Sequence, residues 1–366
     1  MDKEFLKVYL KNRFLGQITP LHVSFQVTTV CNLECAYCCV DAKLPRKNEL
    51  TTQEAKKLLS EIKKMGSPLV VFTGGEPLLR SDLLELAEHC QKIQLKTGLA
   101  TNGALLTLEK AKQLNSAGLK LFHFSLDGSN EEIHCAYRGK GNFSQVLSGM
   151  DSVLATGASI IAQTTLTHKN KNDLGNIAKL LFPKKIKVWR LQFSLPCGRG
   201  QEFALKEEFS LQETTRLMED VYVLSKEYPS MHVDMHAIQY YKVFLYKKYG
   251  NDIKKKMLMH LRGGCSLMKG GIIYVDSDGF LRPCPHFPYR IEDESVRTKS
   301  ISDIFRSNAL LKNLRNKSLL HGACRECKYL FCCGGCRAKV FYKTKDFFAE
   351  DNDCPFLELK NKQVIN

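Results

Sequence analysis

Three cysteines near the start of the chain have the type and spacing of a metal-binding loop. They are Cys31, Cys35 and Cys38, separated by three and then by two residues. Thiolates on one short loop can point at a common centre, such as an iron–sulfur cluster or a zinc ion. A [4Fe–4S] cube has four irons, so three thiolates would leave one iron open to another molecule. A structural zinc loop, or cysteines that only pack, is the alternative.

Length and composition indicate a globular protein with metal sites. The 366 residues suffice for one large domain and a smaller one. No apolar run reaches about 18 residues, so no membrane insertion is predicted. Residues 1–20 carry charges throughout and do not resemble a signal peptide. Fifteen cysteines without an export signal favour metal sites over disulfides and a reducing, cytoplasmic location.

The net charge of +16 has two interpretations. The basic residues are scattered, which favours a solvated, lysine-rich surface. The alternative is an acidic partner: a carboxylate-rich small molecule, an acidic peptide or RNA. Aromatic residues are not interleaved with the basic ones as a base-stacking surface would require, so nucleic acid is disfavoured.

The elements that must position the cysteines alternate between strand and helix patterns. Capping boxes begin helices at Thr51 and Ser210, and Asp173 is a predicted N-cap of another helix. Six strand–helix units in a row predict a parallel sheet, open or barrel-like. The predicted strands cover residues 21–29, 69–73, 93–100, 119–125, 159–166 and 187–194, with 231–235 as a further candidate.

Polar motifs follow the predicted strands at the points where these end. Gly74-Gly75-Glu76-Pro77 follows the second strand, Thr101-Asn102-Gly103 the third and Ser125-Leu126-Asp127-Gly128 the fourth. The carboxyl ends of parallel strands converge on one face, where such folds keep their chemistry. We therefore expect these motifs to meet the cysteine loop in one site.

The cysteine loop, with Tyr37 before its third cysteine, and the Gly-Gly-Glu motif resemble those of radical S-adenosylmethionine (SAM) enzymes. The resemblance implies an α/β fold with a partial (β/α)6 barrel and a [4Fe–4S] cluster on Cys31, Cys35 and Cys38. In that family the open iron binds SAM, and the reduced cluster cleaves it to methionine and a 5′-deoxyadenosyl radical. The chain would then be a radical SAM oxidoreductase or maturase, supplied with electrons by a flavodoxin- or ferredoxin-type reductant.

The same resemblance implies which residues contact SAM. Glu76 would receive the ammonium group, Tyr37 would lie beside the adenine, and Ser125 and Asp127 would contact ribose or carboxylate. Arg138 resembles an arginine that pairs with the SAM carboxylate, with an ordinary surface arginine as the alternative. The whole implied set is Tyr37, Gly74, Gly75, Glu76, Pro77, Asn102, Ser125, Asp127 and Arg138.

Residues 263–366 hold eight of the fifteen cysteines. Two Cys-x-x-Cys pairs lie close together, which is a strong metal signal, with two structural zinc ions as the alternative. Residues 272–275 and 280–282 predict a hairpin with a tight turn at Asp278-Gly279.

This region resembles the SPASM extension, an auxiliary-cluster domain of many radical SAM enzymes. The resemblance implies a cluster on Cys324, Cys327, Cys333 and Cys354, and another on Cys265, Cys284 and Cys336. The second set lacks a fourth cysteine, so it has an open iron or takes His286 or Cys197. Cys332 could replace the adjacent Cys333, and Cys39 has no ligand role in this hypothesis.

The implied domains are an N-terminal extension (1–20), the barrel (21–235), a helical linker (236–262) and a small cysteine-rich α+β SPASM domain (263–366). Relatives with this extension modify peptide or protein side chains, or remove carboxyl groups from tetrapyrroles. The sequence places peptide or protein modification first and a tetrapyrrole substrate second. A non-catalytic iron–sulfur or zinc protein is the remote alternative.

Overall fold

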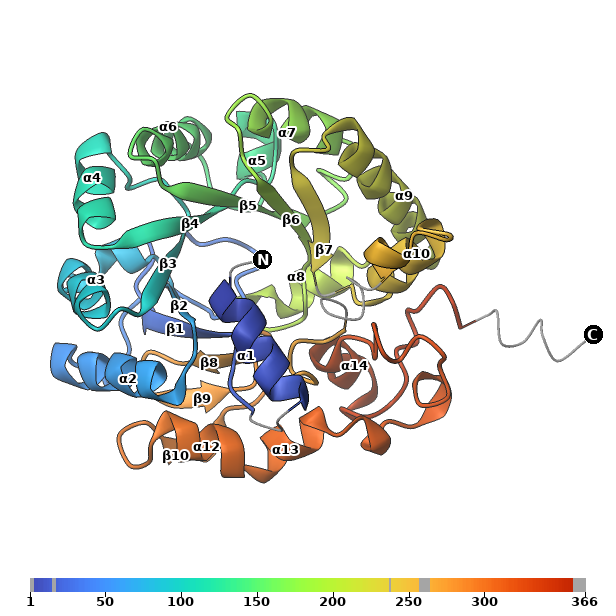
Figure 1. The fold of residues 1–366 in the computed structure, drawn as a ribbon. Helices are drawn as coiled ribbons and strands as arrows, with labels where there is room; N and C mark the ends of the chain where they lie inside the picture. The colour runs from blue at the N-terminus through green and yellow to red at the C-terminus, as the bar shows by residue number, and fades with distance from the viewer. Residues whose placement is uncertain (1–2, 15–17, 237, 257–263, 358–366) are drawn as a thin grey trace, which may run out of the picture.

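One curled sheet runs through the computed structural model, which describes residues 3–14, 18–236, 238–256 and 264–357. Neighbouring strands from β1 to β7 pair in parallel, and helices cover the outside of the sheet (Figure 1). The predicted strand–helix alternation is thus confirmed. The parallel strands are β1 (His22–Thr28), β2 (Leu69–Gly74), β3 (Lys96–Thr101), β4 (Leu119–Ser125), β5 (Ser159–Leu166), β6 (Val188–Phe193) and β7 (His232–His236).

The outer helices follow from amphipathic patterns and from their caps. Both predicted capping boxes are present: Thr51 begins α2, and Ser210 begins α9. The apolar face of α2 is buried. These helices are α2 (Thr52–Met65), α3 (Leu83–Lys92), α4 (Leu108–Ser116), α5 (Glu131–Cys135), α6 (Phe143–Leu154), α7 (Leu174–Leu181), α8 (Gln201–Lys206) and α9 (Leu211–Glu227).

Asp173 occupies the N-cap position of α7, as predicted. Its side chain makes no capping hydrogen bond with α7. The carboxylate instead accepts hydrogen bonds of 2.7 Å from both the backbone N–H and the hydroxyl of Ser129. A tertiary partner with two donors has replaced the local cap, and it ties the segment after β4 to the start of α7.

The C-terminal hairpin belongs to the same sheet as the barrel strands. It comprises β8 (Ile272–Val275) and β9 (Phe280–Arg282), as predicted, and β10 (Ile291–Ser295) follows. β8 pairs in parallel with β1, so the strand order is β10-β9-β8-β1-β2-β3-β4-β5-β6-β7. The sheet therefore continues across the predicted domain boundary at residue 263. This pairing satisfies the backbone groups of β1, which would otherwise lie at an open edge.

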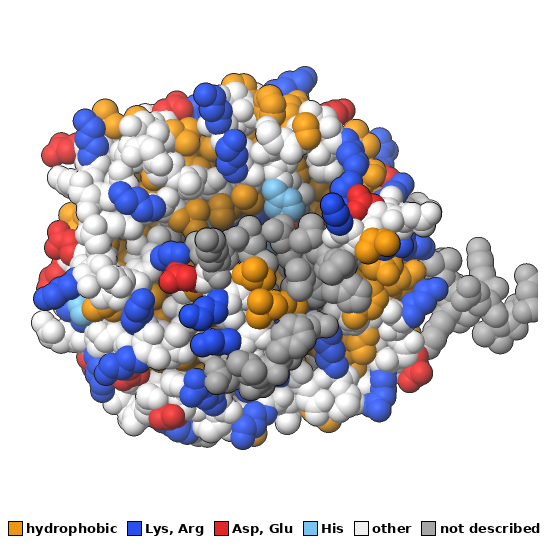
Figure 2. All heavy atoms as spheres, in the orientation of Figure 1, with side chains coloured by type: hydrophobic (Ala, Val, Ile, Leu, Met, Phe, Trp, Pro, Cys, Tyr) orange, Lys and Arg blue, Asp and Glu red, His pale blue; other side chains and the backbone are white. Residues whose placement is uncertain are grey.

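The remaining helices lie around this sheet. In Figure 1, α1 (Lys3–Phe14) lies across one end of the barrel. Among the described residues, no helix is both long and apolar enough to cross a membrane. Figure 2 shows basic side chains spread over the visible face between apolar and acidic ones. The other helices are α10 (Tyr240–Lys248), α12 (Ile301–Ser307), α13 (Ala309–Arg315) and α14 (Arg337–Thr344).

Candidate active site

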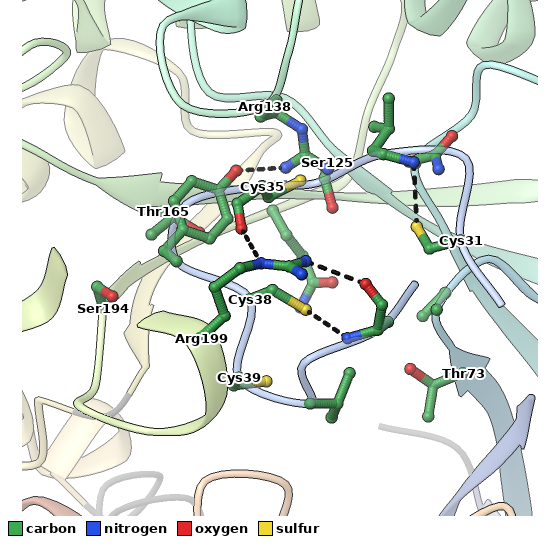
Figure 3. Close-up of a pocket in the computed structure, with 18 of the residues that line it drawn as sticks. Cys31, Cys35, Cys38, Cys39, Thr73, Ser125, Arg138, Thr165, Ser194 and Arg199 are labelled. Atoms are coloured by element: carbon green, nitrogen blue, oxygen red, sulfur yellow. Dashed lines mark hydrogen bonds between the residues drawn. The ribbon is translucent and has the colours of Figure 1, made fainter. Parts of the chain in front are cut away.

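The ends of the parallel strands and the cysteine loop enclose one cavity, as the strand-end motifs predicted. Figure 3 shows its cysteines around a common space, with Ser125 and Arg138 nearby. Its wall contains most of the residues expected to hold a cluster and SAM. Those residues are Cys31, Cys35, Tyr37, Cys38, Gly74, Gly75, Asn102, Ser125 and Arg138.

The three cysteine thiols suit a cluster better than a single ion. Each cysteine is half-buried, and backbone N–H groups of Leu33 and Ala42 donate to the sulfurs of Cys31 and Cys38, both at 3.4 Å. Among the described residues, the three sulfurs do not all lie within 4.8 Å of one another. Burial raises the pKa of Cys31 to about 11 in the metal-free chain, and metal binding would deprotonate this thiol.

Arg199 holds the cysteine loop from the segment after β6. Its Nε donates to the carbonyl oxygen of Cys35 at 3.2 Å and its Nη2 to that of Ala42 at 3.0 Å (Figure 3). Sequence reasoning gave Arg199 no role. Nothing in the local sequence indicates a contact between segments more than 150 residues apart.

Gly74 and Gly75 allow β2 to end against the cysteine loop. A Cβ at Gly74 would lie 2.4 Å from the oxygen of Thr28, and one at Gly75 would lie 2.1 Å from that of Val30. The Gly75 N–H donates to the Thr28 oxygen at 2.8 Å. Close packing of two backbones therefore requires glycine here, independently of any ligand.

Glu76 is fully buried and lies outside the residues described as lining the cavity. Its carboxylate accepts hydrogen bonds from the Thr101 hydroxyl and the Asn102 N–H, both at 2.8 Å, and from the Leu78 N–H at 3.2 Å. Burial raises the pKa of Glu76 to about 7, against the opposing effect of these donors. Glu76 thus ties the end of β2 to the end of β3, and its contact with the SAM ammonium stays a prediction. Pro77, which begins the short helix η1 (Pro77–Leu79), is also buried outside the described wall.

Asp127 lies behind the wall and holds three residues that form it. It accepts hydrogen bonds from Arg138 Nη1 at 3.0 Å, from the Tyr37 hydroxyl and from the Thr165 N–H at 2.7 Å. Asp127 is thus a positioning group in this structure, and its direct contact with SAM stays a prediction.

Arg138 is buried in the cavity wall, so its interpretation as a surface arginine is wrong. Its Nη1 donates to Tyr37 at 2.7 Å as well as to Asp127. Its Nε has no hydrogen-bond partner among the described residues. A buried guanidinium with an unused donor fits an anionic ligand group.

Four of the C-terminal cysteines line a second cavity: Cys324, Cys327, Cys333 and Cys354. The adjacent Cys332 is fully buried outside the described wall, and its thiol donates to the Tyr329 oxygen at 3.5 Å. This geometry favours Cys333 over Cys332 as the ligand. Backbone N–H groups of Asp351 and Gly335 lie 3.4 and 3.5 Å from the sulfurs of Cys324 and Cys333, a common arrangement around cluster thiolates.

The other three C-terminal cysteines also lie together. Cys265 and Cys336 are buried, and Cys284 packs beside both. Burial, and then the nearby thiols of Cys336 and Cys265, raise the pKa of Cys284 well above its ordinary value. The candidate fourth ligands Cys197 and His286 lie next to each other, with Sγ and Nδ1 3.7 Å apart.

Comparison with known proteins assigns the family. A family model of the radical SAM superfamily matches residues 25–181, and one of the SPASM iron–sulfur cluster-binding domain matches residues 265–328. The AdoMet-dependent heme synthase of Methanosarcina barkeri is 30% identical over 342 residues, covering 92% of this chain and 96% of that protein. The chain belongs to the radical SAM superfamily. It is an enzyme whose cofactors are a [4Fe–4S] cluster, SAM and auxiliary iron–sulfur clusters.

Other relatives of this radical SAM protein carry different names. Mycofactocin maturase MftC of Mycolicibacterium smegmatis is 25% identical over 358 residues, covering 93% of this chain and 83% of that protein. Streptococcus suis SuiB, solved with its precursor peptide SuiA, shares the fold with a TM-score of 0.76 at 17% identity, covering 93% of this chain and 78% of SuiB. The predicted partial barrel with a SPASM domain is thus confirmed.

Proposed function

We propose that this radical SAM enzyme removes carboxyl groups from the side chains of a tetrapyrrole. The observation that carries the proposal is the similarity to an AdoMet-dependent heme synthase at 30% identity over nearly the whole of both chains. The similarity to the mycofactocin maturase is lower, at 25%. Peptide or protein modification, which the sequence placed first, becomes the second candidate.

The charge of the cavity wall supports a substrate rich in carboxylates. The described lining residues include Arg138 and Arg199 but no aspartate or glutamate. Arginine recognises carboxylates better than any other side chain because its planar fork matches their geometry. The net charge of +16 would also favour the approach of a polycarboxylate.

The chain's own residues would hold the cofactors and position them. Cys31, Cys35 and Cys38 would hold the cluster, and the free donor of Arg138 would bind the SAM carboxylate. When bound there, the cluster and SAM would supply the radical chemistry that removes a hydrogen atom from a substrate carbon. Asp127 fixes Arg138 and Tyr37 before any ligand arrives, so neither has to reorganise on binding.

A small groove adjoins the cavity, and a substrate that extends beyond the cavity would contact it. The two spaces share Phe193, Ser194 and Leu195 in their walls, and the groove continues to Phe209 and Tyr342. Aromatic and aliphatic side chains are suitable partners for the flat, apolar face of a macrocycle.

The reaction needs an electron acceptor. When a hydrogen atom and then carbon dioxide leave a propionate side chain, a vinyl group and one electron remain. The auxiliary clusters held by the C-terminal cysteines would supply the acceptor. We further propose a flavodoxin- or ferredoxin-type donor for the first cluster, and a cytoplasmic location where thiols stay reduced.

The test is anaerobic turnover of the reconstituted enzyme with SAM, dithionite and an iron porphyrin that carries free propionate groups. We expect the porphyrin to shift in absorbance on binding, and mass spectrometry to show loss of carboxyl groups together with 5′-deoxyadenosine. The same porphyrin with esterified propionates and the Cys35→Ala enzyme are the two controls.

Two results would count against the proposal. One is an unchanged porphyrin in a preparation that still cleaves SAM. The other is equal turnover of the free and esterified porphyrins. Modification of an added peptide instead would support the second candidate.

A further inference from the structure

Cys39, Cys197 and His286 form a compact cluster beside the cavity. Cys197 and His286 are the candidate fourth ligands of the cluster on Cys265, Cys284 and Cys336, whereas Cys39 belongs to none of the expected cluster sets. Their two sulfurs and one ring nitrogen all lie within 4.8 Å of one another. Within the described part of the chain, no other group of three cysteine, histidine or acidic residues meets this spacing. We propose that these three side chains bind a single divalent metal ion, with zinc as the preferred ion.

The distances suit one tetrahedral ion. Zinc binds sulfur at about 2.3 Å and nitrogen at about 2.0–2.1 Å, which places a sulfur and a nitrogen ligand about 3.6 Å apart. The observed separation between Cys197 Sγ and His286 Nδ1 is 3.7 Å. Ligands on different irons of a cube are held apart by the cluster itself, so such close spacing favours a single ion. Two thiolates and an imidazole are also a ligand set that zinc accepts readily.

Three distant segments build this site, and each is held by its own packing. Cys39 ends the cysteine loop, Cys197 follows β6, and His286 follows β9. A Cβ at Gly198 would lie 2.7 Å from the backbone oxygens of both Cys38 and Cys39, so glycine allows the loop with Cys197 to approach. The neighbour of His286, Phe287, is fully buried and stacks on Phe347 at 4.5 Å. The three side chains are therefore pre-positioned for a metal ion.

The site opens onto the active-site cavity. Cys39 and His286 lie in the same wall as Cys35 and Arg138, while Cys197 is buried behind them. Figure 3 shows Cys39 next to Cys38 at the edge of this space. Three protein ligands leave the fourth position of a tetrahedral ion free. Water, or a carboxylate or thiolate of the substrate, would complete the coordination.

The test uses enzyme purified anaerobically with its full iron and sulfide content and then equilibrated with one equivalent of zinc chloride. We expect about one zinc per chain by elemental analysis, and X-ray absorption should show two sulfur ligands and one nitrogen ligand. Cys39→Ser, Cys197→Ser and His286→Ala should each retain at least about tenfold less zinc with unchanged iron. Cys135→Ser, a half-buried cysteine elsewhere, is the matched control and should keep the zinc.

A rescue variant keeps the test decisive if one of these variants folds poorly. His286→Cys preserves a ligand, so it should retain zinc with three sulfurs in its X-ray absorption spectrum. Loss of about four irons in Cys197→Ser or His286→Ala would overturn the proposal, because it would assign these residues to the cluster of Cys265 and Cys284. Absence of bound zinc, or equal zinc in every variant, would overturn it as well.

Discussion

The two cysteine-rich regions of the molecule differ in how they expose their sulfurs. Cys31, Cys35 and Cys38 are half-buried and face a cavity. Of the seven C-terminal cysteines expected to hold clusters, four are buried and three are half-buried. The buried ones are Cys265, Cys324, Cys333 and Cys336, and the half-buried ones are Cys284, Cys327 and Cys354. A cluster that must bind and cleave SAM needs an accessible iron, whereas a cluster that passes electrons can be shielded from water. The deeper burial of four auxiliary cysteines is in keeping with a division between the catalytic and the auxiliary clusters.

Removing one ligand from each region should show most clearly whether the two regions have separate functions. Cys35→Ala should abolish 5′-deoxyadenosine formation, because SAM cleavage depends on the cluster that this loop would hold. Cys327→Ala should lose about four irons per chain yet still cleave SAM in the absence of substrate. Iron analysis and chromatography of 5′-deoxyadenosine measure both effects. Equal loss of SAM cleavage in the two variants would contradict the division.

The next largest effect concerns the buried polar network of Tyr37, Asp127 and Arg138 beside the catalytic loop. Asp127→Asn leaves the buried Arg138 guanidinium without its carboxylate, so we expect a loss of about 3–5 kcal/mol in unfolding free energy. SAM binding should weaken at least about tenfold, since Tyr37 and Arg138 lose their common anchor. Denaturant unfolding and SAM titration measure these changes.

The control for this variant is Glu34→Gln, which removes an ion pair with Lys43 on the exposed side of the same loop. It should leave both measurements unchanged, because exposed pairs contribute little. A similar loss in the two variants would show that Asp127 has no special positioning role.

Close backbone packing against the cysteine loop gives a smaller effect. Gly75→Ala places a methyl group 2.1 Å from the Val30 oxygen, so the two segments must separate, at a cost of about 1–3 kcal/mol or more. Gly175→Ala is the control, because no atom lies within 4 Å of its added Cβ. It should be neutral, or stabilising by at most about 1 kcal/mol. Thermal unfolding of the metal-free chains should show a lower transition temperature for Gly75→Ala alone.

The most gradual expected effect is a pH dependence from Glu76. Burial raises the pKa of this carboxyl from 4.5 to about 7, so folding favours its protonated form. The protonated Glu76 carboxyl makes its full contribution to the free energy of unfolding below pH 4.5. This contribution is lost as the pH rises from 4.5 through 7, at no more than about 1.4 kcal/mol per pH unit. Glu76→Gln should remove this part of the profile.

The comparison between wild type and Glu76→Gln isolates Glu76 from other titrating groups. The buried His134, whose pKa burial lowers to about 4, acts in the opposite direction but is common to both proteins. Unfolding of both proteins between pH 5 and 8 is the measurement. Parallel profiles would show that Glu76 is ionised throughout this range.

The sequence by itself determined the elements and the chemistry they carry. The spacing of Cys31, Cys35 and Cys38 indicated a cluster with an open iron, and hydrophobic periodicity with capping boxes predicted the strands and helices. Polar motifs after the strands predicted where the site lies, because the carboxyl ends of parallel strands meet at one face. These features were predictable because each depends on residues that are close together in the chain.

Only the tertiary structure decided which side chains meet. Three contacts join segments that are separate in the sequence. They are the hydrogen bonds of Arg199 to the cysteine loop, the pairing of Asp127 with Arg138, and the pairing of β8 with β1. The meeting of Cys39 with His286 also joins separate segments. Such contacts depend on strand register and on backbone packing, as at Gly75, and neither periodicity nor local spacing encodes them.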